Sequence, residues 1–252
     1  MCLILFAWQA HARYPLVVAA NRDEFHERPT LAADFWPRQP GLLAGRDLQA
    51  GGTWLGVTRS GRFAAVTNYR EPLVPEAPLE RSRGELVTDF LAGRQAPLAH
   101  AEALLASGSS YRGFNLLLGA PDALAYVSNR QDRAQVVSPG SHGLSNHLLD
   151  TKWPKVCSGR ERLNKLLQED RIDAEALLDL VTDRNAVPGD MPLDAGDGEV
   201  HQYLMNHYFI VSPVYGTRSS TVVLVDNDGA IEFVERRFDP DGAETGTSRF
   251  IL

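Results

Sequence analysis

The sequence predicts an α+β fold of two antiparallel sheets packed together, with helices covering their outer faces. Stretches typical of strands and of helices alternate along the chain in the order strand, helix, strand, helix, strand. The 252 residues, 44% hydrophobic and 23% charged, are enough to bury one large core or two small ones. Since no low-complexity linker divides the chain, residues 1–252 are expected to form a single domain.

The first part of the chain is rich in short strand-like runs separated by turns. They are CLILFAW, YPLVVAANRDE, and the pair TWLGVTRS and RFAAVTNY, which Gly61 is expected to join as a hairpin. From Arg83 the hydrophobic period changes to that of a helix. Its apolar face comprises Leu86, Val87, Phe90 and Leu91. A second run of helix formers, LAHAEALLAS, follows a proline.

Strands return in GFNLLLGAPDALAYVSN, which predicts a hairpin turning at Pro121 and Asp122. The run AQVVSPGSHGLSN is expected to continue the same sheet. Near the C-terminus, YFIVSPVYGTRSSTVVLVDNDGAIEFVERRF is strongly strand-like and contains an Asn227-Asp228-Gly229 turn of the hairpin type.

A second helical block lies between these strand regions. The period predicts a helix from Trp153 to about Gln168, whose apolar face includes Cys157 as a small core residue, and DAEALLDLVTD adds another helix. The following segment, residues 185–202, is rich in proline, glycine and aspartate. Its length predicts a surface excursion at the edge of a pocket.

Composition argues against several classes of function. The net charge of −7 and the pI near 5.5 provide no basic field for nucleic acid. The opening LILFAW lacks the basic flank and length of a signal peptide, and no segment is long and apolar enough to span a membrane. Two cysteines are too few for a disulfide scaffold, and the seven histidines show no metal spacing. A cytoplasmic protein with reduced thiols fits best.

Cys2 stands directly behind Met1, at the head of an apolar run. A residue this small lets the processing aminopeptidase remove the methionine, which would place a thiol and a free α-amine on one residue. Their ordinary pKa values lie at about 8.5 and about 8, so the amine can accept the thiol proton. Cys2 could then supply both nucleophile and base, given donors for the oxyanion and a charged group to tune it.

Side chains of the required types lie where strand-like runs end. They are the tetrad Asn21-Arg22-Asp23-Glu24, Asn68, Asn146 and Arg218. Each has an ordinary structural alternative. Asn68 and Asn146 could be turn residues, because asparagine is common in turns. The tetrad could be a solvated strand end, and Cys2 could be a small hydrophobic residue of a strand.

Five motifs occur together in order: Met1-Cys2, ANRDEF, TNYRE, LSNHLLDTKWPKV and YGTRSSTVVLVD. With these five motifs in this order, the chain resembles the NRDE family from Cys2 to Asp226. This family is also called the transport and Golgi organisation protein 2 family. That family is similar to the cysteine-type N-terminal nucleophile hydrolases, such as penicillin V acylase, bile-salt hydrolase and acid ceramidase. The resemblance implies their four-layer αββα sandwich.

The resemblance also implies roles for the candidate residues. Cys2 matches the nucleophile and its freed amine the base. Asn68 matches the side-chain oxyanion donor of these hydrolases, and Asn146 matches their second active-site asparagine. Arg218 matches an arginine that comes late in their sequences and lies near the nucleophile. The hydrolases carry Arg-Asn-x-Asp where this chain has Asn21-Arg22-Asp23-Glu24, so that motif does not transfer position by position. We expect Arg22 and Asp23 to bracket Cys2, with Glu24 as the alternative inward carboxylate, because alternate strand residues face opposite ways.

Three functional hypotheses follow. The first is a hydrolase that cleaves the carbon–nitrogen amide bond of a small acylated substrate through a thioester on Cys2, without a cofactor or metal. The second is a non-catalytic protein that binds or carries haem or lipid, because NRDE-family members are associated with haem trafficking and lipid homeostasis. The chain has no Cys-x-x-Cys-His motif for covalent haem, so haem would be a reversibly bound cargo. A trafficking adaptor is the third, and the sequence leaves the oligomeric state open.

Overall fold

The computed structural model describes residues 2–71, 81–107, 110–188 and 199–252, and the chain divides into two compact units. The first unit comprises the chain up to Glu27 together with Pro139–Ser145 and Leu149–Leu252. The second comprises Arg28–Ser138 and Asn146–Leu148. Each unit is built on one antiparallel sheet, so both sheets of the sequence prediction are present.

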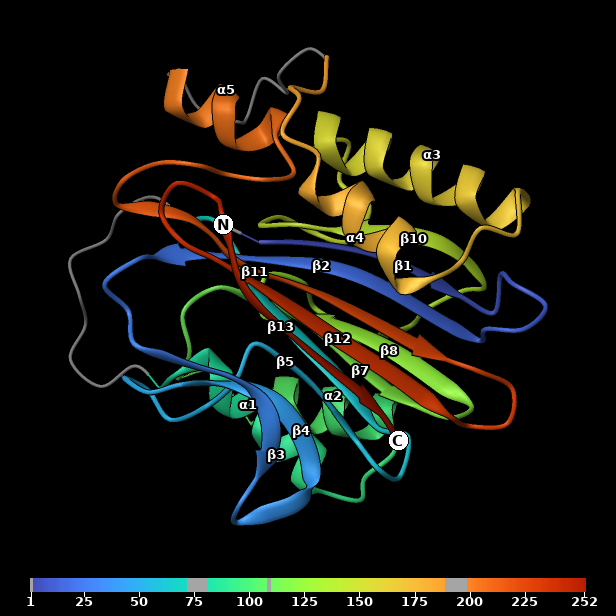
Figure 1. Cartoon of the computed structure of the whole chain (residues 1–252). Helices are drawn as coiled ribbons and strands as arrows, with labels where there is room; N and C mark the ends of the chain where they lie inside the picture. The colour runs from blue at the N-terminus through green and yellow to red at the C-terminus, as the bar shows by residue number, and fades with distance from the viewer. Residues whose placement is uncertain (1, 72–80, 108–109, 189–198) are drawn as a thin grey trace. The chain divides into compact units, whose positions relative to one another are not determined.

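The first unit's sheet carries helices on one face (Figure 1). Its strands, in spatial order, are β10 (Gly140–Leu144), β1 (Leu3–Trp8), β2 (Leu16–Phe25), β11 (Tyr215–Val225), β12 (Ile231–Phe238) and β13 (Glu244–Ile251). Helix α3 (Pro154–Gln168) packs on β1 and β10, and α4 (Ala174–Thr182) on β2 and β11. A third helix, α5 (Glu199–Asn206), contacts α3.

Strand alternation explains how β1 and β2 receive these helices. Leu3, Leu5 and Ala7 on β1, with Val17 and Ala19 on β2, belong to one buried cluster with residues of α3 and α4. Because successive side chains of a strand point to opposite faces, these odd-numbered positions form the face under the helices. By the same alternation, Asn21 and Asp23 point toward the helices, whereas Arg22 and Glu24 point to the opposite face.

Helix α3 lies close to β1 because Gly159 faces Leu5. A Cβ built on Gly159 would come within 2.7 Å of both methyl carbons of Leu5. Gly159→Ala should therefore lower the free energy of unfolding by about 1–2 kcal/mol, the cost of overpacking exceeding alanine's better helix propensity. Chemical denaturation measures this change.

Gly41→Ala is the matched control, since a Cβ at Gly41 meets nothing within 4 Å. This variant should stay within about 0.5 kcal/mol of the parent chain. Equal stability of the two variants would contradict close packing of α3 on β1.

The second unit has an antiparallel meander covered by two helices (Figure 1). Its strands, in spatial order, are β3 (Thr30–Trp36), β4 (Gln39–Asp47), β5 (Leu55–Thr58), β6 (Phe63–Asn68), β7 (Phe114–Ala120), β8 (Ala123–Ser128) and β9 (Gln135–Val136). Helix α1 (Arg83–Ala92) packs on β5 and β6, and α2 (Pro97–Ala106) on β7 and β8.

Several local predictions are confirmed. The apolar face of α1 is buried as expected, with Leu86, Val87, Phe90 and Leu91 in the second unit's core. The β5–β6 and β7–β8 hairpins form where Gly61 and the Pro121-Asp122 turn predicted them. β11 and β12 pair across the predicted Asn227–Gly229 turn.

Other expectations need correction. The run AQVVSPGSHGLSN does not continue a single sheet: β9 pairs with β8, whereas β10 pairs with β1 in the first unit. The predicted excursion over residues 185–202 ends earlier, because α5 begins at Glu199; residues 189–198 lie outside the described residues. Cys157 is half-buried rather than a core residue. Strands β3, β4 and β13 had no sequence prediction.

Candidate functional site

Cys2 lies at the entrance to β1 in the first unit. Leu3 pairs with Asn21 of β2, so the register brings Cys2 beside Arg22. The side chain is half-buried, and the Ser145 hydroxyl donates a hydrogen bond of 2.7 Å to the Cys2 carbonyl oxygen. The backbone N–H of Asp23 donates to the Cys2 thiol. Hydrogen bonds therefore hold Cys2, the candidate nucleophile, from both sides: from Ser145 at the end of β10 and from Asp23 of β2.

The Asn21-Arg22-Asp23-Glu24 tetrad lies inside β2 and does not follow its end. β2 continues to Phe25 because β11 pairs with it over this whole stretch. Asn21, Arg22 and Asp23 are 2%, 6% and 4% exposed, so the alternative of a solvated strand end is wrong. Three adjacent polar side chains in the middle of a sheet need partners on both faces.

Asn21 joins three segments under the helices. Its Nδ2 donates to the carbonyl oxygens of Val181 and Tyr208, each at 2.7 Å, and its Oδ1 accepts from the Ser220 hydroxyl at 2.6 Å. Val181 is in the last turn of α4, whose carbonyls have no partner within the helix. All these contacts lie within the protein interior, which points to a structural role for Asn21.

Asp23 is the carboxylate that acts on Cys2. Its Oδ1 accepts a 2.7 Å hydrogen bond from the Thr217 hydroxyl, which in turn accepts from the Ile210 N–H at 2.9 Å. Burial raises the pKa of Asp23 above its usual range and outweighs the groups that lower it, which are the N-terminal amine, Lys155, the Thr217 hydroxyl and Arg22. The fixed hydroxyl orients the carboxylate within the sheet.

Burial also raises the pKa of the Cys2 thiol, and the charge of Asp23 raises it further. The charge of the N-terminal amine, the Asp23 backbone N–H and the Arg22 guanidinium oppose these effects, but the pKa of the thiol stays raised. Arg22 and Asp23 therefore both act on Cys2. Since the raised pKa keeps the resting thiol protonated, a reaction at Cys2 needs a proton acceptor.

Glu24 is placed differently from Asp23. It lies on the Arg22 face of β2, with 4.0 Å between an Arg22 guanidinium nitrogen and a Glu24 carboxylate oxygen. Its other carboxylate oxygen accepts a 2.9 Å hydrogen bond from the Phe25 N–H. Glu24 is thus a neighbour of Arg22 at the end of the strand, whereas Asp23 carries the carboxylate that acts on Cys2.

Lys155 is a site residue that sequence reasoning missed. It lies in the first turn of α3, is 0% exposed, and its Nζ donates a 2.9 Å hydrogen bond to the Leu204 carbonyl of α5. Burial lowers the pKa of Lys155, while the charges of Asp23 and Cys2 raise it. A lysine in the first turn of a helix opposes the helix dipole. That misfit, directly after Pro154, is the sequence signal that could have found it.

Arg218 lies on β11 opposite Arg22 and Asp23 of β2. The β2–β11 register shifts between Thr217 and Ser219, so Arg218 is the extra residue of a β-bulge. Its guanidinium donates a 2.8 Å hydrogen bond to the Phe25 carbonyl oxygen. The Arg218 guanidinium therefore lies at the end of β2, beyond Asp23.

The two asparagines of the prediction come together in the second unit. Asn68 ends β6 with an exposed side chain. Asn146 is 3% exposed, and its Nδ2 donates a 2.8 Å hydrogen bond to the Asn68 carbonyl oxygen. The Arg70 N–H donates to the Asn146 carbonyl at 2.7 Å. Asn146 therefore fixes the backbone at Asn68, and it is not an exposed turn residue.

The chain matches a family model described as Transport and Golgi organisation 2 over residues 1–240. It belongs to the Transport and Golgi organisation 2 family. Relatives include the Transport and Golgi organization protein 2 homologs of Bos taurus, 39% identical, and Homo sapiens, 37% identical. Both comparisons cover 100% of this chain and 99% of the relative. The Drosophila melanogaster protein is 28% identical over 96% of this chain and 95% of its own length.

The fold of this Transport and Golgi organisation 2 chain is similar to that of a solved structure. The Caenorhabditis elegans N-acylethanolamine-hydrolyzing acid amidase ortholog matches with a TM-score of 0.52 at 11% identity, over 88% of this chain and 92% of that one. The predicted α+β fold class, with two antiparallel sheets that carry helices, is thereby confirmed.

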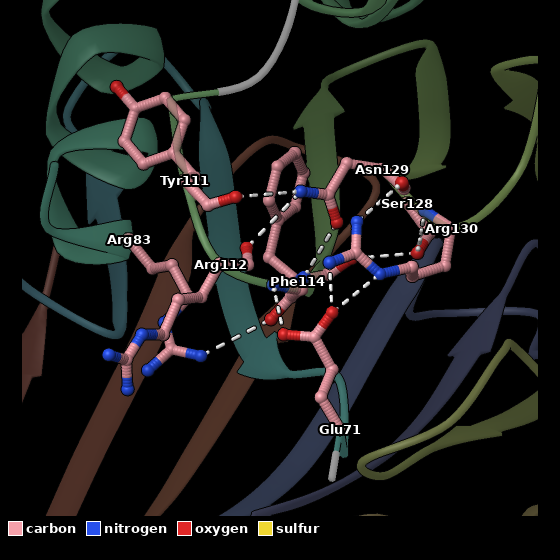
Figure 2. A network of polar contacts seen from close by, with 9 residues as sticks. Glu71, Arg83, Tyr111, Arg112, Phe114, Ser128, Asn129 and Arg130 are labelled. Atoms are coloured by element: carbon pink, nitrogen blue, oxygen red, sulfur yellow. Dashed lines mark hydrogen bonds and ion pairs between the residues drawn. The ribbon is translucent and has the colours of Figure 1, made fainter. Parts of the chain in front are cut away.

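The family's TNYRE motif ends in a polar network of the second unit (Figure 2). Glu71 accepts a 3.0 Å hydrogen bond from the Gly113 N–H and is paired with the Arg130 guanidinium. Burial would raise the pKa of Glu71, but these two partners outweigh it and the pKa is lowered. Nearby, Asn129 bonds the backbone around Phe114. The motif thus also anchors the start of β7.

Two properties of the Transport and Golgi organisation 2 chain concern membranes and metals. In the part of the chain that the structure describes, none of the helices has both the length and the apolar character needed to cross a bilayer. Over the same residues, histidine, cysteine, aspartate and glutamate side chains form no group of three or more that could hold a metal ion.

Proposed function

We propose that this protein is an N-terminal cysteine hydrolase that cleaves the amide bond of a small acylated substrate. The observation that carries the proposal is the placement of Cys2 beside Arg22 and Asp23 of β2, both of which act on its thiol. The likeness in fold to the C. elegans amidase supports it, because that amidase hydrolyses N-acylethanolamines.

The proposed reaction starts with removal of Met1. The Cys2 sulfur then attacks the amide carbonyl carbon, and the thiol proton passes to the new α-amine of Cys2. Breaking of the carbon–nitrogen bond releases the amine, which takes that proton, and leaves a thioester on Cys2. Water hydrolyses the thioester to a carboxylic acid and restores the thiol. These steps balance without a cofactor or a metal.

The remaining roles rest on the resemblance. Asn68 is proposed as the oxyanion donor, Asn146 as the second asparagine of the site, and Arg218 as the arginine near the nucleophile. The hydrogen bond from the Asn146 side-chain amide to the Asn68 carbonyl oxygen supports the pairing of the two asparagines, because it fixes the strand end that carries the donor.

The test is an intact-mass measurement with N-terminal peptide mapping after brief exposure to a limiting thiol-reactive acyl probe. We expect loss of Met1 and acylation of Cys2 in preference to Cys157, which is also half-buried and so provides an internal reference. A Cys157→Ser variant should label as the parent chain does.

Retention of Met1 together with equal labelling of the two cysteines would contradict the proposal. Reversible binding of haem or lipid on this fold would then be the function to measure. A titration with haem, followed by its Soret band, and one with lipid vesicles would distinguish the two cargoes. A saturable shift of the Soret band would identify haem as the cargo, and saturable binding to the vesicles would identify lipid.

A further inference from the structure

Lys155 is a fully buried cation that the reaction proposed above does not use. It is 0% exposed in the first turn of α3, while its neighbours Val156 and Trp153 belong to the first unit's hydrophobic cluster. Burial of an ammonium group is costly unless an opposite charge and hydrogen-bond acceptors compensate it. Lys155 should therefore have a specific electrostatic partner.

The structure supplies two kinds of compensation. The Nζ donates a 2.9 Å hydrogen bond to the Leu204 carbonyl, in the last turn of α5, where the helix dipole favours a positive charge. Asp23 is the carboxylate whose charge acts most strongly on Lys155, and Cys2 also acts on it. The geometry agrees, because Asp23 points from β2 toward the helix layer that contains Lys155.

Asp23 in turn needs a counter-ion. It is 4% exposed, and a buried carboxylate tends to take up a proton and become neutral. The charges that lower its pKa are, in decreasing order, the N-terminal amine, Lys155 from α3 and Arg22 from β2 itself, but burial outweighs them and the pKa of Asp23 is raised. The Thr217 hydroxyl of β11 adds a hydrogen bond, and the Tyr215 hydroxyl contacts its backbone oxygen.

We propose that Lys155 is a positioning residue of the Cys2 site: from the helix side of the sheet it holds Asp23 as an ionised carboxylate beside Cys2. This inference rests on the proposed function for the use of that carboxylate, which would orient the α-amine of Cys2. Lys155 acts through Asp23 and contacts no substrate.

The test compares the titration of Asp23 in the parent chain and in Lys155→Met, which has a similar length and no charge. Carbon NMR of aspartate-labelled protein follows the carboxyl, and an Asp23→Asn variant assigns its signal. We expect the Asp23 midpoint to rise by about one to three pH units in Lys155→Met. Lys155→Arg should keep the midpoint near that of the parent chain. An unchanged midpoint in folded Lys155→Met overturns the inference.

The double variant Asp23→Asn/Lys155→Met covers the case in which Lys155→Met alone does not fold. Recovery of folding in the double variant would support the inference, because it removes the uncompensated carboxylate. Failure of both would show that the lysine is needed for packing alone and would reject the counter-ion role. The titration is independent of turnover, so a parent chain that shows no acylation of Cys2 would overturn the proposed function and leave the Asp23 result interpretable.

Discussion

Cys2→Ala is expected to remove acyl transfer almost completely. The substitution deletes the sulfur that forms the thioester, and loss of the covalent nucleophile from an enzyme lowers kcat by roughly a thousandfold or more. The fold should persist, because the side chain of Cys2 is only half-buried and its carbonyl still accepts the Ser145 hydrogen bond. Release of amine from a panel of small N-acyl amides measures the change.

Cys157→Ser is the control for this prediction. Cys157 lies on α3 and is also half-buried, so the exchange tests loss of a thiol outside the Cys2 site. We expect Cys157→Ser to release amine from the same amides at the rate of the parent chain. Hydrolysis that survives in Cys2→Ala, with thermal unfolding unchanged, would mean that another group carries the chemistry.

The second large effect concerns stability. Asn21→Ala should lower the free energy of unfolding by about 3–5 kcal/mol, since it leaves buried partners without their hydrogen bonds. Those partners are the carbonyls of Val181 and Tyr208 and the hydroxyl of Ser220, which lie on three different segments. Urea denaturation followed by fluorescence gives the value.

A matched asparagine is available at the surface. The Asn227 side chain donates one 2.7 Å hydrogen bond to the Ala12 carbonyl from an exposed turn. Asn227→Ala should cost less than about 1 kcal/mol. If Asn21→Ala lowers the free energy of unfolding by no more than Asn227→Ala does, the interpretation of Asn21 as the junction of three segments is wrong.

Local patterns in the sequence predicted much of the fold. The helical period at Leu86, Val87, Phe90 and Leu91 depends on neighbours within one helix, and the structure buries that face as expected. The pairing of β10 with β1 could not be predicted in this way, because it joins residues more than 130 positions apart in the chain, such as Ile4 and Leu144. Strand period alone does not identify the partner strand.

The candidate site was predictable in part. Cys2, Arg22 and Asp23 stood out by type and order, but their burial depends on β11 pairing with β2 as far as Phe25. Lys155 was missed because a lysine in a helix is ordinarily a surface residue, and only the packing of α3 and α5 shows otherwise. The roles of Asn68, Asn146 and Arg218 still rest on the resemblance and stay predictions.

The β-bulge at Arg218 has a consequence for the length of β11. Thr217 and Ser220 are three residues apart, which in a regular strand would put their hydroxyls on opposite faces, yet they bond Asp23 and Asn21 on the same face. Deleting one residue at the bulge would exchange the faces of the residues that precede it and take the Thr217 hydroxyl away from Asp23. Selection on this strand therefore acts on its residue count, so insertions and deletions should be less tolerated here than side-chain substitutions.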